Sequence, residues 1–396
     1  MKKIVLVMTA LVAASTATWA QKAKVKSAEN CVILKQFDKA KSDIDEAMVH
    51  AKTADDPNTF LTAADVYIEC AINGVGDDDM LDKAKSFIEK AEELDAKGNA
   101  KGKNIGKAQK AILKYYQQFN GKAQQYGSKA WGDKNFKNAK KAFDYAIWSN
   151  KQRLKEAYNE IADTTEIYNS ALAAMQEPDY KFAAERFMKT AELGYDGPMS
   201  ILRANYCFEQ MGDSASMEKT LKYGFQKYPE SKDVLTTLIQ YYLSAQRSSE
   251  ALVYLNQAIE KDPTNVQYYF ARGCLNEKID VEKAIEDYNI ALEKDPKFFN
   301  ALYNLGVVYY NKGIEIMNVA SGERDNKKYD ALVKQANDQF MKSAPYLERA
   351  VEATDSKENK KYSLDALKSI YYRLVSAELV PDEKYSSVMS RLRELE

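Results

Sequence analysis

The sequence has few of the residues that build catalytic and metal centres. It contains one histidine, His50, and four cysteines in 396 residues, with no Cys-x-x-Cys pair. A single histidine cannot supply a Ser-His-Asp triad, a Cys-His pair or a multi-histidine metal site. The acidic residues are scattered along amphipathic segments, as on solvated helix faces. We therefore predict no enzymatic activity, no metal and no cofactor.

Glycine and proline are also scarce, with 16 and 8 residues, while hydrophobic residues make up 45% and charged residues 29% of the chain. Collagen-like, disordered and turn-rich all-β chains contain more glycine and proline than this. The composition favours an all-α protein, and its length indicates several domains or an extended repeat.

Neither sign of charge is in excess, because the sequence has 57 basic and 58 acidic residues. Sequence-independent binding of nucleic acid depends on clustered lysine and arginine. We therefore predict no nucleic-acid partner.

Long apolar runs are absent except at the start of the chain. Lys2 and Lys3 precede an apolar run over 4–14, and Thr18-Trp19-Ala20 follows with small residues at its first and third positions. This layout is typical of a secretory signal peptide, cleaved after Ala20. Gln21 stands where a lipoprotein would have cysteine. We predict an exported protein, periplasmic, outer-membrane-associated or secreted, with no direct membrane insertion after cleavage.

An oxidising compartment permits disulfides between cysteines whose Cα atoms lie within about 7 Å. Cys31 and Cys70 can pair if adjacent repeats bring them together. Cys207 and Cys274 lie two repeats apart by the spacing given below, and we expect both to be free and buried.

What the sequence does have is a period. Pro229, Pro263 and Pro296 lie 34 and 33 residues apart, and alanines repeat at the same interval. Between the prolines the apolar residues follow helical spacing, as in Val281, Ala284, Ile285, Tyr288, Ala291 and Leu292. Since the residue before proline leaves the α region, Asp295 ends one helix before Pro296. Each unit is therefore two helices and a turn.

The pattern resembles the tetratricopeptide repeat, W-x2-L-G-x2-Y, then A-x3-F, then P over about 34 residues. Leu302, Leu305, Gly306 and Tyr309 match its first half. A further unit is filled throughout, by Leu235, Leu238, Ile239, Tyr242, Ala251, Leu255, Ala258 and Pro263. The resemblance implies an all-α superhelix of αα-hairpins, with glycine placed where the two helices of a hairpin approach closely.

The predicted organisation follows from this pattern. Residues 1–20 form the signal peptide, 21–121 divergent helical repeats, 122–360 the tetratricopeptide array, and 361–396 C-terminal capping helices. Within the array, the register fails at about 314–345. We interpret this stretch as a hairpin with both helices extended, either a length variation or an arm for docking or dimerisation.

Two short motifs have a structural explanation. Residues 98–107 contain Lys101-Gly102-Lys103 but lack the spacing and the hydroxyl residue of a phosphate-binding loop. Asp77, Asp78 and Asp79 lack calcium-ligand spacing and are better explained as helix capping before Met80.

In the family, the first helix of each unit lines a concave groove. The matched positions are Asn169, Ala173, Leu202, Tyr206, Thr236, Gln240, Phe270, Cys274, Tyr303, Val307 and Tyr310. Eight of them are the predicted groove contacts, namely Leu202, Tyr206, Thr236, Gln240, Phe270, Tyr303, Val307 and Tyr310. The basic residues with which some members bind a peptide carboxylate are lacking at these positions. The aromatic residues can equally be core.

The signal peptide, the repeats and the extended hairpin together resemble exported tetratricopeptide proteins of Gram-negative envelopes. Our leading hypothesis is a non-enzymatic interaction scaffold of the cell envelope that binds a protein or peptide segment in the groove. The alternative is a glycan-binding accessory protein of a nutrient-uptake system, because tyrosine is abundant, with 27 residues, and can stack on sugars. The pattern identifies neither the partner nor the oligomeric state.

Overall fold

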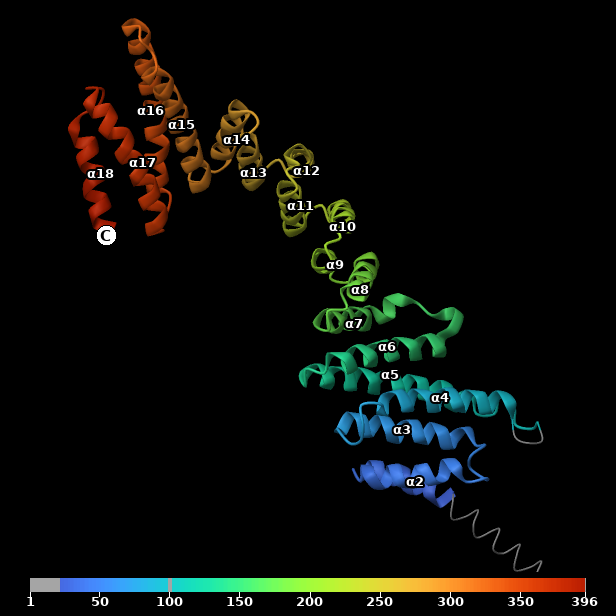
Figure 1. Cartoon of the computed structure of the whole chain (residues 1–396). Coiled ribbons are helices and arrows are strands. Elements are labelled where there is room, and N and C mark those ends of the chain that lie inside the picture. Colours follow the sequence, from blue (N-terminus) through green and yellow to red (C-terminus); the bar gives the residue numbers. More distant parts are fainter. Residues whose placement is uncertain (1–21, 99–101, 396) are drawn as a thin grey trace, which may run out of the picture. The chain divides into compact units, whose positions relative to one another are not determined.

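The computed structural model describes residues 22–98 and 102–395, and the predicted signal peptide lies outside them. Every regular element in these ranges is helical, and consecutive helices pair as hairpins (Figure 1). The prediction of an all-α fold of αα-hairpins is confirmed. Two compact units are present, one ending at Thr237 and one beginning at Leu238. This division falls within the predicted array, and the domain boundaries given above stay predictions.

The first unit opens with long helices. Residues 22–33 are helical, and the next elements are α2 (Phe37–Val49), α3 (Pro57–Asn73), α4 (Met80–Lys97), α5 (Gln109–Gly132) and α6 (Phe136–Leu154). A continuous core of alanines and larger apolar residues joins them, with Tyr116 and Phe119 fully buried at its α5 side. Alternating small and large side chains let the helices approach closely.

Shorter hairpins complete the first unit. Two 3-10 turns, η1 (Lys155–Ala157) and η2 (Glu160–Asp163), precede α7 (Thr164–Gln176), α8 (Tyr180–Leu193), α9 (Gly197–Gln210) and α10 (Ser214–Lys227). Helix α11 (Lys232–Ser244) contains the point of division between the units.

The second unit continues with α12 (Ser248–Lys261), α13 (Val266–Asn276), α14 (Val281–Lys294), α15 (Phe299–Ser321), α16 (Asn326–Glu352), α17 (Lys357–Ser376) and α18 (Asp382–Leu395). The hairpin expected around 314–345 corresponds to α15 and α16, which have 23 and 27 residues. Figure 1 shows these two helices side by side, with the end that they share extending past α17 and α18.

Local chemistry explains where the helices begin and end. Asp179, Asp213 and Asp280 each precede a helix and accept a hydrogen bond from a backbone N–H in its first turn, which satisfies an amide without a helical partner. Asp295 has extended backbone at the end of α14, and α15 begins three residues after Pro296. The predicted helix break at Pro296 is confirmed.

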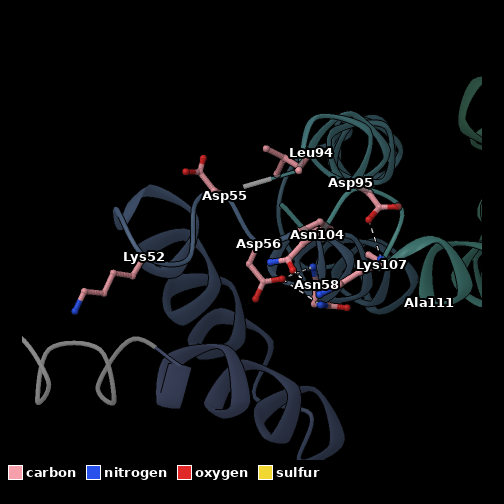
Figure 2. Close-up of a pocket in the computed structure, with 12 residues that line it drawn as sticks. Lys52, Asp55, Asp56, Asn58, Leu94, Asp95, Asn104, Lys107 and Ala111 are labelled. Carbon is pink, nitrogen blue, oxygen red and sulfur yellow. Dashed lines mark hydrogen bonds between the residues drawn. The ribbon is translucent and has the colours of Figure 1, made fainter. Parts of the chain in front are cut away.

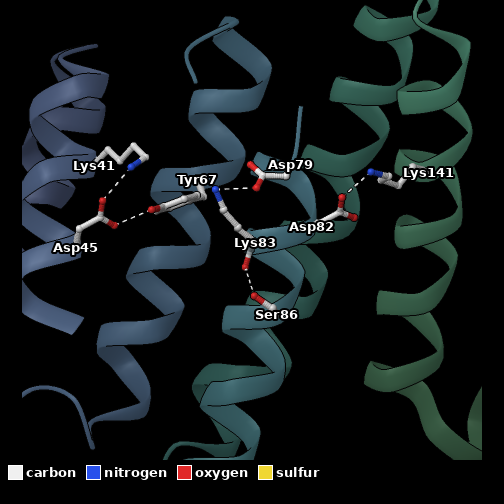
Figure 3. Close-up of polar contacts among 8 residues, drawn as sticks. All are labelled: Lys41, Asp45, Tyr67, Asp79, Asp82, Lys83, Ser86 and Lys141. Atoms are coloured by element: carbon white, nitrogen blue, oxygen red, sulfur yellow. Dashed lines mark hydrogen bonds and ion pairs between the residues drawn. The ribbon is translucent and has the colours of Figure 1, made fainter. Parts of the chain in front are cut away.

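Polar contacts also join neighbouring hairpins, as Figure 3 shows for the first unit. Asp45 on α2 accepts hydrogen bonds from Lys41 and from Tyr67 on α3, at 2.9 and 2.7 Å. Burial and the Asp45 carboxylate raise the pKa of Tyr67 to about 12. Asp79 does not cap α4 with its side chain, because its carboxylate pairs with Lys83 at 2.8 Å.

All four cysteines are free. The Cys31 and Cys70 thiols donate to different acceptors, Gln36 Oε1 and the Phe37 carbonyl, so the conceivable disulfide is not formed. Cys207 is free and buried as predicted. The same prediction was wrong in part for Cys274, which is free but only half-buried, because it lies at the edge of α13 beside Tyr288 and Asn304.

Candidate functional site

The eight predicted groove residues are divided between the two units. Leu202, Tyr206 and Thr236 belong to the first unit, and Gln240, Phe270, Tyr303, Val307 and Tyr310 belong to the second. One continuous groove through all eight therefore stays a prediction, and each part is described by itself.

The residues of the first part are accessible. The Tyr206 side chain is 44% exposed and meets the Tyr180 ring edge-on, with 6.4 Å between ring centroids. Thr236 is exposed and Leu202 half-buried, as is Asn169, whereas Ala173 is buried. Gln240, at the start of the second unit, is exposed.

The aromatic residues of the second part also serve packing. Phe270 is half-buried and contacts Tyr288 and Phe298, with ring centroids 5.8 and 5.4 Å apart. Tyr303 is half-buried and stacks on Phe299 at 5.9 Å. Both rings pack against the apolar core of the second unit, so they belong in part to the core. Val307 is half-buried as well.

Tyr310 leads to a site that the sequence pattern did not show. It lines a cavity of about 790 Å³, which we call the C-terminal pocket. The lining residues come from four helices and are Tyr310, Met317, Val333, Asn337, Lys368, Ser369, Tyr372, Arg373, Ser376, Ala377 and Tyr385.

The extended hairpin builds this pocket. Met317 lies in the extension of α15, and Val333 and Asn337 lie in the matching part of α16. Helices α17 and α18 close the other side, where the rings of Tyr372 and Tyr385 lie 6.0 Å apart between centroids. A hairpin of ordinary repeat length would lack the wall that Met317, Val333 and Asn337 form.

The pocket is basic. Lys368 and Arg373 line it, and no aspartate or glutamate does. Neither cation forms an ion pair or a side-chain hydrogen bond within the part of the chain that the structure describes. The Arg373 guanidinium lies 5.6 Å from the centroid of the Phe340 ring, which supports its position. Although the matched groove positions lack basic residues, α17 therefore supplies two beside Tyr310.

Sequence reasoning missed the residues of α17 and α18 because it assigned both helices to capping. The run Tyr371-Tyr372-Arg373-Leu374 was the available signal, since Tyr372 is 64% exposed while Tyr371 and Leu374 are buried. One helical turn thus places a buried face next to an aromatic and basic one.

Further cavities lie in the first unit. One, of about 440 Å³, is bounded by the α2–α3 and α4–α5 connections (Figure 2). Its carboxylates stabilise the backbone, because Asp95 accepts the Ala108 N–H at 2.7 Å and Asp56 accepts the Asn58 N–H at 3.0 Å. We assign it a structural role.

Another cavity, of about 720 Å³, lies between residues 22–33, α3 and α5, and we call it the α3–α5 groove. Its cation is already neutralised, because Lys122 pairs with Asp65 and Glu69 at 2.5 and 2.8 Å. Burial opposes ionisation of Lys122, but these carboxylates raise its pKa. Glu29 and several apolar residues also line the groove, together with the uncharged polar side chains of Asn58, Gln117, Gln118 and Gln125.

Helices α13, α14 and the first part of α15 form one joint between hairpins, with Asp295 and Pro296 separating the last two helices. Residues 275–313, which span this joint, match a family model described as a TPR repeat. This part of the chain is therefore similar to a tetratricopeptide repeat. The glycine expected between the helices of such a hairpin is Gly306, which contacts Leu347 on α16.

Three solved structures are similar to parts of the chain. A TPR repeats protein from Bacteroides fragilis has 20% identity and a TM-score of 0.35, covering 62% of this chain and 97% of its own. YrrB, described as a TPR protein with an unusual peptide-binding site, has 19% identity and a TM-score of 0.33, with coverage of 58% and 98%. MamA from Desulfovibrio magneticus has 15% identity and a TM-score of 0.32, with coverage of 49% and 97%. No curated protein matches the chain significantly.

Neither a metal cluster nor a membrane span is found in the described ranges. No group of three or more His, Cys, Asp or Glu side chains there could hold a metal ion. No helix in 22–98 or 102–395 combines the length and the apolar character needed to cross a bilayer.

Proposed function

We propose that the protein is a non-enzymatic interaction scaffold that holds a segment of a partner protein in the C-terminal pocket. The observation that carries this proposal is the grouping of three tyrosines, Tyr310, Tyr372 and Tyr385, around an open pocket with two cations that form no ion pair with any described residue. Aromatic and arginine side chains contribute most to binding energy at protein interfaces.

The repeat itself supports this function. A tetratricopeptide hairpin leaves one helix face uncovered by its own unit, and an array presents these faces as a binding surface. The pocket volume lies in the range of sites that enclose a small ligand or a few residues of a peptide.

The place of action in this proposal is outside the cytoplasm, in the cell envelope or beyond it. Its support is the layout of residues 1–20, with Lys2 and Lys3, an apolar run and small residues at positions 18 and 20. Detection of a mature chain that begins at Gln21 in the exported fraction tests it. A chain that keeps Met1 inside the cell contradicts it.

Selection of random peptides displayed on phage tests the pocket. The mature chain serves as bait, and the pocket variant carries Tyr310→Ala, Tyr372→Ala and Tyr385→Ala. A control variant carries Tyr329→Ala and Tyr362→Ala, which remove two exposed tyrosines outside the pocket. We expect peptides that bind the wild type and the control but lose about tenfold or more in affinity for the pocket variant.

Two results would overturn the assignment, provided that circular dichroism shows all variants folded. One is a set of peptides that bind the pocket variant as tightly as the wild type. The other is a selection that enriches no peptide at all. A parallel Tyr206→Ala variant measures whether the predicted groove of the first unit contributes.

Glycan binding is the alternative function, and the amide side chains in the lining of the α3–α5 groove favour it for that part of the chain. Amide side chains such as Gln117 and Gln125 can hydrogen-bond to sugar hydroxyls. A panel of defined oligosaccharides, screened by thermal shift, tests this. A shift that Gln117→Ala and Gln125→Ala abolish would support it, and no shift with any sugar would dismiss it.

A further inference from the structure

We infer that the segment held in the C-terminal pocket is acidic, with a carboxylate next to an apolar or aromatic side chain. This inference rests on the proposed function and adds the chemistry of the occupant. It follows from the charges that line the pocket, from the cations elsewhere in the same unit, and from the shape of the apolar walls.

The first argument is the contrast with other cations of the second unit. Lys312 pairs with Glu282, Lys384 with Glu348 and Arg391 with Glu352, each between different helices at 2.5 to 2.7 Å. Lys368 and Arg373 have no such partner among the described residues, although both are on the same helix and line one cavity. The pocket therefore keeps a net positive charge that the chain itself does not neutralise.

The second argument is the set of hydrogen-bond donors. Tyr310, Tyr372, Tyr385 and Asn337 line the pocket together with the two cations, whereas the Ser369 and Ser376 hydroxyls donate to backbone carbonyls of α17. Hydroxyl and amide groups can donate to an anion, and a planar guanidinium binds a carboxylate with two parallel hydrogen bonds. With no acidic side chain in the lining, an entering carboxylate meets donors and no like charge.

The third argument concerns the class of ligand. Met317 and Val333 form an apolar wall opposite α17, and both are half-buried rather than sealed in the core. This wall can bury an apolar side chain beside the carboxylate. Polyanions such as nucleic acid depend on many clustered cations, and the pocket has two. A peptide segment with one or two carboxylates matches both the charge and the apolar surface.

The experiment uses pairs of short fluorescent peptides. The first member of each pair is a peptide selected as described above. The second has every Asp and Glu replaced by Asn and Gln and a blocked, amidated C-terminus. Fluorescence anisotropy with the mature wild-type chain measures the dissociation constants at low and at high salt. We expect the neutral peptide to bind about tenfold more weakly, and salt to weaken the acidic peptide more.

Charge-reversal variants locate the effect. Lys368→Glu and Arg373→Glu, alone and together, should weaken binding of the acidic peptide, and the double variant should bind a version with Lys in place of Glu better than the wild type does. Lys357→Glu with Lys361→Glu is the matched control, because it changes the net charge equally on α17 outside the pocket lining. Because Arg373 contacts the Phe340 ring, its replacement can also disturb packing. The single variant Lys368→Glu changes the charge of the pocket without removing this contact.

The outcomes separate the two proposals. Equal affinity for acidic and neutral peptides, with loss of both in the tyrosine pocket variant, would overturn the acidic occupant and keep the proposed function. Equal loss in the Lys357→Glu, Lys361→Glu control would show that net charge rather than the pocket is responsible, which would also overturn it. Absence of any selected peptide would overturn the proposed function itself.

Discussion

Gly306 on α15 lies against Leu347 on α16 so closely that a Cβ atom on residue 306 would be 2.6 Å from the Leu347 Cγ atom. The Ser343 hydroxyl donates a hydrogen bond of 2.6 Å to the Gly306 carbonyl, which fixes the same crossing. Both helices continue from this contact to the walls of the C-terminal pocket. The separation of α15 and α16 there depends on the absence of a side chain at position 306.

Gly306→Ala should therefore destabilise the protein. The added methyl group must displace Leu347, and overpacking of this kind costs about 1 to 3 kcal/mol of unfolding free energy. Gly121→Ala in α5 is the control, because a Cβ there meets no atom within 4 Å and alanine is the better helix former by up to about 1 kcal/mol. Urea unfolding followed by circular dichroism measures both. A stabilised Gly306→Ala variant would contradict this packing.

Asp287 on α14 is a second residue on which the stability of the fold depends. Its buried carboxylate accepts hydrogen bonds from Arg272 Nε at 2.9 Å and Asn276 Nδ2 at 2.9 Å, both on α13. Asp287→Ala leaves these donors unsatisfied and should cost about 2 to 3 kcal/mol of unfolding free energy. Glu282→Ala removes an exposed ion pair with Lys312 and should change stability by about 1 kcal/mol or less. Similar losses in both variants would refute the importance of the buried network.

Glu166 in the first turn of α7 should make stability depend on pH. Burial, and secondarily the nearby Asp163 charge, raises the pKa of its carboxyl group. The folded state then holds a proton more tightly than the unfolded state, so stability falls as pH rises from about 4.3, the unfolded pKa, through the folded pKa. Glu166→Gln should be more stable than the wild type at neutral pH, with a difference that shrinks toward pH 4. Thermal unfolding of both proteins between about pH 4 and pH 7 measures this difference in stability. A difference that stays constant with pH would contradict the raised pKa of Glu166.

The cysteines should remain thiols and react slowly. Burial raises the pKa of the Cys70 and Cys207 thiols to about 11, and it also raises that of Cys274. Since the thiolate is the reactive form, alkylation of the folded protein should be slow, with half-buried Cys274 first. Mass spectrometry after alkylation counts four thiols once the chain is unfolded. A count of two without reductant, with Cys31 and Cys70 as the unmodified cysteines, would show that these two are paired.

The helices and their ends followed from local patterns. The spacing of Pro263 and Pro296, and the apolar positions of α14, predicted both the helix breaks and the buried face, because proline and helical periodicity act within a few residues. The close approach at Gly306 followed from the repeat pattern as well. Cys274 was misjudged because its exposure depends on how far α13 is covered by its neighbours.

The candidate site was predicted only at Tyr310. Lys368, Tyr372 and Tyr385 lie in helices that a repeat pattern assigns to the end of an array, where sequence periodicity carries no information about cavities. Their placement beside Met317 and Val333 required knowing that the extended α15 and α16 pass α17 and α18.

The sequence by itself thus determined an all-α array of hairpins. The small, apolar and proline positions repeat every 33 to 34 residues, and stacking of neighbouring hairpins buries the apolar faces of their helices. Only the tertiary structure decided that the extended hairpin and the last two helices enclose a basic, tyrosine-lined pocket. The physical reason is that a helix pattern specifies which face is buried, whereas a pocket depends on where faces from four helices fail to meet.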